Sequence, residues 1–157
     1  MSFLSSINPT ETYANAEFAL GTIASLTTSQ GTKRYKFVQY DTGAGSVAAV
    51  AGNVCYVYAV SGTSAGQVHV VTSDLSDSAE VGAGVLQSAP TDGQYCWIQV
   101  RGQATLNTAL TAGVDGDPLT PTGATDGTLD VTTASTDHIC AVAIDASAKI
   151  VLCLFPD

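Results

Sequence analysis

Residues 93–131, GQYCWIQVRGQATLNTALTAGVDGDPLTPTGATDGTLDV, decide the fold class of this chain. The stretch opens with two alternating sets of side chains, Tyr95, Trp97, Gln99 and Arg101 on one side and Cys96, Ile98 and Val100 on the other. A period of two predicts a half-buried β-strand. Glycines and prolines divide residues 102–131 into short pieces, as turns do. The stretch therefore predicts strands and turns that present surface, with no reactive residue among them.

The composition limits both the size of the protein and its partners. A chain of 157 residues fits one domain with a substantial core. Charged residues make up 12% of the chain, about half the roughly 25% of ordinary soluble domains, so the surface is expected to be neutral and polar. A formal charge of -9 disfavours nucleic acid and anionic membranes as partners. The one local exception is the basic cluster of Lys33, Arg34 and Lys36.

Targeting and membrane segments are not predicted. No basic residue precedes Lys33, and Pro9 interrupts the polar opening of the chain, which is unlike a secretory signal. Glycines and polar residues interrupt residues 42–67, the longest uncharged stretch, so no 20-residue apolar span remains.

The four cysteines, Cys55, Cys96, Cys140 and Cys153, each lie in an apolar run. None has the close pair spacing of a metal site or a redox motif. We interpret them as small buried hydrophobic residues, with disulfides as the alternative. No metal or other cofactor is predicted.

Strand-like segments follow one another quickly from Lys33 onward. They are KRYKFVQY (33–40), NVCYVYAV (53–60), QVHVVTS (67–73), VGAGVLQS (81–88), QYCWIQVRG (94–102), GTLDVTT (127–133), HICAVAID (138–145) and AKIVLCLF (148–155). Most are rich in β-branched and aromatic residues. Helix patterns are weak, with one or two turns conceivable at residues 10–20 and one at 46–52. The sequence therefore predicts an all-β protein, a single compact antiparallel β-sandwich or barrel with little helix.

The domain organisation has two further features. Residues 1–18 lack a sustained period and predict a short extended N-terminal arm, either disordered or ordered against a partner, before a β domain at 19–157. Residues 49–58 with 81–100 resemble residues 110–121 with 138–155, which suggests two similar halves. Turn chemistry alone can also produce such similarity.

Three short motifs match those of enzymes or nucleotide sites. Asp41-Thr42-Gly43 matches the Asp-Thr-Gly of aspartic peptidases, but it is equally a good turn after a strand. The segment GTSAG (62–66) matches a nucleophile elbow, which needs a helix after it, whereas strand-like QVHVVTS follows here. The segment GAGSVA (43–48) resembles a dinucleotide loop, but too few residues precede Gly52 for its helix. We interpret all three as turns or loops.

The remaining polar residues have simple explanations. His69 and His138 are expected to be surface or hydrogen-bonded histidines. Asp115-Gly116-Asp117 departs from the calcium-binding EF-hand pattern and predicts a turn. Three further acids form a solvated loop, namely Asp74, Asp77 and Glu80. Trp97 could stack on a sugar, but a single tryptophan is more often part of a core or subunit interface.

Three segments carry a resemblance to a known family. They are AGSVAAVAGNVCYVYAV (44–60), GQYCWIQVRGQATLNTALTAGVDGDPL (93–119) and HICAVAIDASAKIVLCLF (138–155). A Tyr-x-Trp strand leads into Arg-Gly and then into an Ala-Gly-x-x-Gly-Asp-x-Leu turn. With this pattern of strands and turns, residues 33–155 resemble the small decoration or cement proteins on the capsids of tailed bacteriophages.

The resemblance implies a structural function. Such proteins are compact β domains, often trimeric, that bind the major capsid protein on the outer surface of the virion and brace the shell. It implies no enzymatic activity, no cofactor, and synthesis in the bacterial cytoplasm of the host. We expect capsid or subunit contacts at the apolar arm and the basic cluster, with nearby aromatic anchors. The predicted contact residues are Phe3, Leu4, Ile7, Lys33, Arg34, Tyr35, Lys36, Tyr40 and Trp97.

Two other functions remain open. The first is a glycan- or receptor-binding β module of a phage tail or fibre, which would need exposed aromatic side chains around a shallow site. The second, more distant, is a homodimeric aspartic peptidase that uses Asp41.

Overall fold

The computed structural model describes residues 3–4, 6–59 and 67–157. Its strands are β1 (Phe3–Leu4), β2 (Thr12–Tyr13), β3 (Ile23–Thr28), β4 (Gly31–Tyr40), β5 (Val54–Tyr58), β6 (Val70–Thr72), β7 (Ser78–Leu86), β8 (Tyr95–Thr105), β9 (Pro118–Thr120), β10 (Asp130–Val131), β11 (Ala141–Asp145) and β12 (Ile150–Leu154). A single 3₁₀ turn at Leu75–Asp77 is the only helical element among these residues.

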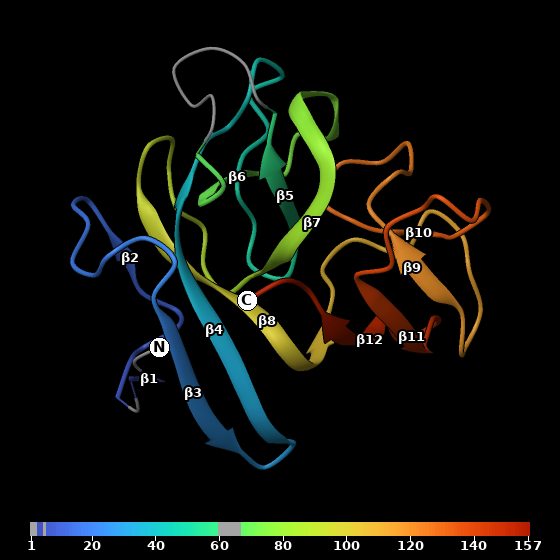
Figure 1. Ribbon diagram of the computed structural model, residues 1–157, viewed down its shortest axis with the longest axis horizontal. Coiled ribbons are helices and arrows are strands. Elements are labelled where there is room, and N and C mark those ends of the chain that lie inside the picture. The colour runs from blue at the N-terminus through green and yellow to red at the C-terminus, as the bar shows by residue number, and fades with distance from the viewer. Residues whose placement is uncertain (1–2, 5, 60–66) are drawn as a thin grey trace.

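Five strands close into a barrel in the order β4-β6-β5-β7-β8, because β8 pairs again with β4 (Figure 1). The predicted all-β fold is thereby confirmed as a barrel. Most pairs are antiparallel, but β4 runs parallel to β6, and β1 runs parallel to β3. The parallel pair is possible because β5, which is antiparallel to β6, lies in the long connection between β4 and β6.

Strand β8 links the barrel to a second group of strands. Its residues 95–101 pair with β4 on one edge, while residues 101–105 pair on the other edge with β12. The group continues through β11 and β9 to β10. Gly102 lies at this transition with φ of 94°, a left-handed conformation that glycine adopts without strain. Strand β8 can therefore pair first with β4 of the barrel and then with β12 of the second group.

One large core runs through the barrel and into the second group. It contains Val38 and Tyr40 of β4, Ile98 of β8 and, beyond the barrel, Leu119 and Val151. Burial of these side chains is the main source of stability, at about 1.5–3 kcal/mol for each large aliphatic residue. The barrel and the second group therefore share one apolar core.

Two local predictions were wrong or incomplete. Neither residues 10–20 nor residues 46–52 form a helix. All eight predicted strand segments contain a strand, but β1, β2, β3 and β9 were not predicted. The sequence of β3, IASLTT, is short and half polar, and pairing with the long β4 stabilises it as a strand. Across the described part of the chain, no helix has the length and hydropathy needed to span a bilayer.

The prediction that β8 is half buried was also wrong. Residues 96–100 of β8 are buried on both faces. Cys96, Ile98 and Val100 face the main core, while Trp97 and the partly buried Tyr95 belong to a second cluster outside the barrel. The chain itself covers the outer face, because the segment before β3 lies across it (Figure 1).

The same pairing order occurs twice. Strand β5 pairs with β7, and β7 pairs with β8; likewise β9 pairs with β11, and β11 pairs with β12. All four pairs are antiparallel. A duplication would produce this arrangement, and the two similar halves remain a prediction.

Candidate interaction surface

An aromatic cluster on the outer face of β4 and β8 is covered by the arm. The ring of Phe18 lies 5.2 Å from that of Phe37 and 5.1 Å from that of Trp97, measured between centroids. Tyr13 meets Phe37 edge to face at 5.5 Å, and Ile7 packs against the same cluster. Edge-to-face and tilted contacts of this kind add to the stability of an aromatic core. The arm therefore binds its own barrel along residues 7–20.

Four predicted contact residues must be revised for this reason. Tyr35 and Trp97 are buried beneath the arm, and Tyr40 lies inside the barrel with its hydroxyl donating to the carbonyl of Val47 at 2.8 Å. Lys36 is buried as well. None of the four presents a surface to a partner in this conformation. The side chains of Phe3 and Leu4 are outside the described part of the structure, so their contact role stays a prediction.

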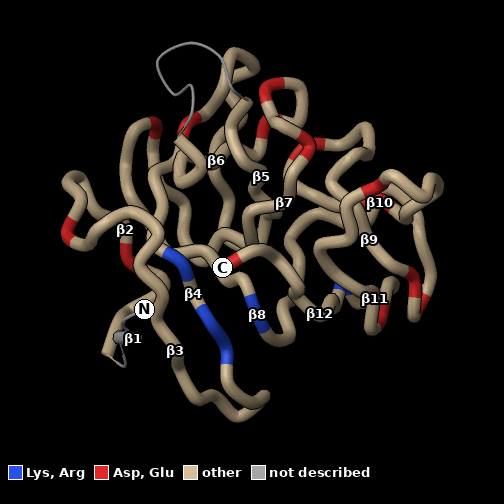
Figure 2. Tube along the Cα trace, in the orientation of Figure 1, with Lys and Arg blue, Asp and Glu red and all other residues tan. Residues whose placement is uncertain are grey.

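The basic cluster holds the C-terminal tail in place. Nη1 of Arg34 lies 2.9 Å from Oδ2 of Asp157, and Nε of Arg101 lies 3.9 Å from Oδ1 of the same residue. Nζ of Lys36 donates to the carbonyl of Pro156 at 3.1 Å, and Nζ of Lys33 donates to Oε1 of Gln30 at 2.9 Å. Figure 2 shows these basic residues along β4 and β8, whereas acidic residues lie mostly in peripheral loops. Much of the cluster's charge is therefore used within the chain.

The Asp-Thr-Gly and glycine-rich motifs form one turn held by carboxylates. Oδ1 of Asp41 accepts from the backbone N–H of Gly43 at 2.8 Å. Oδ2 of Asp74 accepts from the N–H of Gly45 at 2.8 Å, and Oδ2 of Asp77 accepts from Ala44. In a dinucleotide loop, such N–H groups would bind phosphate. Here the protein's own acids occupy them, and no helix follows the turn.

Asp74 is an integral part of this turn. The prediction that it belongs to a solvated loop is wrong, because the residue is buried. Burial alone would raise the pKa of its carboxyl, but hydrogen bonds from the Ser76 hydroxyl and from the backbone N–H groups of Gly45 and Ser76 lower it. The carboxylate is therefore a structural group that ties residues 43–45 to the 3₁₀ turn.

The segment 62–66, which matches the nucleophile elbow, lies outside the described residues. The strands on either side of it, β5 and β6, pair antiparallel, with Tyr56 opposite Thr72.

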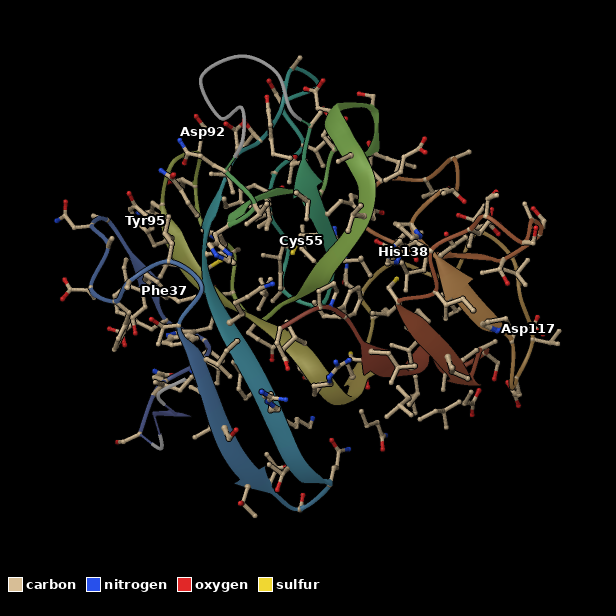
Figure 3. The ribbon with its side chains drawn as sticks, in the orientation of Figure 1. Phe37, Cys55, Asp92, Tyr95, Asp117 and His138 are labelled. Carbon is tan, nitrogen blue, oxygen red and sulfur yellow. The ribbon has the colours of Figure 1, made fainter. Side chains whose placement is uncertain are left out.

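The Asp115-Gly116-Asp117 motif forms a turn, as predicted. Oδ2 of Asp117 accepts from the N–H of Val114 at 2.9 Å, and Oδ1 of Asp115 accepts from the N–H of Ala146 at 2.8 Å. His138 is exposed, on the opposite side of the molecule from Phe37 and Tyr95 (Figure 3). Within residues 3–4, 6–59 and 67–157, no group of three or more histidine, cysteine or acidic side chains could hold a metal ion.

All four cysteines are buried and free, as the apolar runs predicted. Cys55 lies inside the barrel (Figure 3). Burial raises the pKa of the thiols of Cys96, Cys140 and Cys153 to about 12, so they are poor nucleophiles at neutral pH.

The outward face of β11 and β12 is apolar and uncovered. It consists of five aliphatic side chains, Val142, Ile144, Ile150, Leu152 and Leu154. Ile144, Leu152 and Leu154 are 47%, 40% and 41% exposed. Val142 lies directly opposite Leu152, and Leu154 is opposite Arg101 of β8. We call this surface the β11–β12 face. A contiguous apolar patch on a sheet is typical of a protein interface.

The β11–β12 face was not predicted from the sequence. The alternation in KIVLCLF (149–155) shows that one side of β12 is entirely aliphatic, but it does not tell which side faces the core. The burial of Val151 and Cys153 decides this, and leaves Leu152 and Leu154 outside. Comparison of the chain with protein-family models, curated proteins and solved structures gives no match.

Proposed function

We propose that this chain is a structural virion protein that binds the outer surface of a bacteriophage capsid and stabilises the shell. The β11–β12 face supports this function best, because it combines exposed aliphatic side chains with few charges. Docking such a surface onto the major capsid protein would remove apolar area from water without desolvating ions.

The chemistry of the remaining surface agrees with a binding role. Asp41 of the Asp-Thr-Gly turn and Asp74 accept hydrogen bonds from backbone N–H groups, and the four thiols are buried. The glycan-binding alternative receives less support. Of the ten aromatic side chains that the structure describes, six are buried and four are partly buried, so none presents a fully exposed ring for stacking on a sugar.

Capsid binding is tested with purified protein and bare, expanded capsids from the same source. Co-sedimentation at micromolar protein should show stoichiometric binding, and cryo-electron microscopy should show symmetry-related density on the outer surface. Protein that stays in the supernatant at this concentration would contradict the proposed function.

The role of the β11–β12 face is tested by Leu154→Glu. A charge within a docked apolar surface should weaken capsid binding by at least about tenfold, because the carboxylate loses its hydration. Val50→Glu is the matched control, since Val50 is also 41% exposed but lies in the loop before β5. Equal binding by the two variants would show that capsid contacts lie elsewhere.

Self-association is tested on the same samples. Light scattering gives the mass of the free protein, for which we propose a homo-oligomer, with a trimer favoured by the resemblance. A monomer at the concentrations that saturate capsids would contradict that proposal while leaving capsid binding intact.

A further inference from the structure

A cavity of about 310 Å³ lies at one end of the barrel, beneath the C-terminal tail. Its walls come from β4, β5, β7 and the residues just before β6, and the tail residues Pro156 and Asp157 complete them. The cavity therefore lies between these strands and the tail, and it reaches the surface at Val68, which is 61% exposed. Its volume is at the lower end of the range for small-molecule sites, about 300–1,000 Å³.

The walls are mostly aliphatic. Val57, Val68, Val81 and Ala83 line the cavity. Apolar walls of this kind favour a hydrocarbon body, since each methylene group that leaves water stabilises the complex by about 0.8 kcal/mol.

Two nitrogen-bearing side chains also line the cavity, Lys36 and His69. Lys36 lies on the same side of β4 as Val38 and Tyr40, which belong to the main core, and it is only 5% exposed. Its ammonium group donates to the carbonyl of Pro156 at 3.1 Å. An ammonium has three N–H donors, so this bond leaves capacity for a ligand.

His69 supplies a second polar atom. Its Nδ1 is buried and has no hydrogen-bond partner among the residues that the structure describes. The Nε2 edge of the ring faces Gly21, where an added methyl group would lie 2.6 Å from Nε2. Buried polar atoms without partners are uncommon and costly, so a group that accepts from Nδ1 would stabilise this ring.

The electrostatics of the pair favour an anion. Burial lowers the pKa of Lys36 although Cys55 and Asp157 act to raise it, and the carboxylate of Asp157 is paired with Arg34 and Arg101. Burial together with the nearby charge of Lys36 lowers the pKa of His69. Both shifts mean that the positive forms lack sufficient compensation in the cavity. An anion between the two side chains would supply this compensation. It would be attracted by Lys36, which is one of only 5 basic residues in a chain of formal charge -9.

We propose that this cavity binds an aliphatic monocarboxylate. The carboxylate accepts hydrogen bonds from Nζ of Lys36 and from Nδ1 of His69, and the hydrocarbon body packs against the valines. This inference does not depend on the proposed capsid function. Either can fail without the other.

Calorimetric titration of the full chain with butyrate, hexanoate and octanoate provides the test, with hexanol as the uncharged match to hexanoate. We expect saturable binding of one carboxylate per chain, affinity that rises with chain length until the cavity is full, and hexanol at least about tenfold weaker. Absence of binding at millimolar ligand, or equal affinity for hexanol and hexanoate, would overturn the proposal.

Variants locate the site. Lys36→Met should reduce hexanoate affinity by about tenfold or more and leave hexanol unchanged. Lys33→Met is the matched control, because Lys33 is also on β4 but bonds Gln30 outside the cavity, and it should bind hexanoate as the parent protein does.

A second variant keeps the test decisive if Lys36→Met does not fold. Val81→Phe places a ring in the cavity and should exclude octanoate more strongly than butyrate. Amide and side-chain chemical shifts on titration should move at Lys36 and His69 first. Full binding by Val81→Phe, or shifts confined to other regions, would refute the assignment.

Discussion

Strands β8 and β12 have matching inner faces and opposite outer faces. Cys96 and Ile98 of β8, like Val151 and Cys153 of β12, are buried in the same core. On the outer face, β8 carries Trp97, which the arm covers, whereas β12 carries leucines that nothing in the described chain covers. The chain thus shields its aromatic face with its own residues and leaves an aliphatic face uncovered, where a partner can dock.

The difference follows from how the two strands are placed. Strand β8 lies in the middle of the molecule, where β2 pairs with it and the segment before β3 packs against its outer face (Figure 1). Strand β12 is followed by the tail of residues 155–157. This tail turns under the barrel, where Phe155 packs so closely on Gly82 that a side chain there would lie 2.9 Å from its ring. Among the described residues, no segment covers the outer face of β12, where Leu152 and Leu154 stay exposed.

The largest effect in this comparison is expected for Trp97→Ala. Truncation of this fully buried side chain should reduce the free energy of unfolding by about 3–5 kcal/mol, because a cavity opens between the arm and the barrel. Urea denaturation measures it, and Trp97→Phe, which keeps a ring, should lose less. A loss below about 1 kcal/mol would show that the arm does not seal this face in solution.

Phe18→Ala separates the arm from the barrel. Its ring contacts both Phe37 and Trp97 but is partly exposed, so we expect a loss of about 2–3 kcal/mol. The fluorescence of Trp97, the one tryptophan of the chain, should shift to longer wavelength as water reaches it. Glu17→Ala, next to it and exposed, should leave both readouts unchanged. An unshifted spectrum for Phe18→Ala would contradict the arm's covering role.

Cys96→Ser and Cys153→Ser compare the two inner faces. Each places a hydroxyl in apolar surroundings and should cost about 1–2 kcal/mol by urea denaturation. Burial raises the pKa of both thiols to about 12, so a thiol reagent at pH 8 should react slowly with native protein and rapidly after unfolding. Fast reaction of either thiol in the native state would contradict the prediction that the inner faces of β8 and β12 are equally buried.

The smallest effect on stability is expected for Leu152→Thr. Since the side chain already faces water, the free energy of unfolding should change by no more than about 0.5 kcal/mol. Capsid binding should nevertheless weaken, because we expect Leu152 to contribute to docking but not to the stability of the fold. A loss above about 2 kcal/mol would mean that the β11–β12 face is covered by part of the same molecule.

Much of the fold could be predicted because local patterns were strong. β-branched and aromatic runs located eight strand segments, and apolar surroundings identified the cysteines as buried. Strand β3 was missed because its residues have little strand pattern of their own and depend on pairing with β4. The weak helix patterns at residues 10–20 and 46–52 do not form helices. Neither segment has a sustained apolar period, and Tyr13, Phe18 and Leu20 of the first pack against the aromatic cluster instead.

The candidate site was less predictable than the fold. The basic cluster and the aromatic residues look like surface contacts in the sequence, yet Lys36 and Tyr35 are buried. Their exposure depends on what packs against β4 from distant parts of the chain, the arm on one face and the C-terminal tail at the barrel mouth.

The sequence by itself determined the all-β class, the positions of most strands and the buried thiols, because alternation and β-propensity act over a few neighbouring residues. Only the tertiary structure decided how β8 pairs with β4 to close the barrel, which side of β12 faces the core, and that Lys36 and His69 share one cavity. These features depend on contacts between residues far apart in the chain, and local sequence patterns do not specify which distant segments make those contacts.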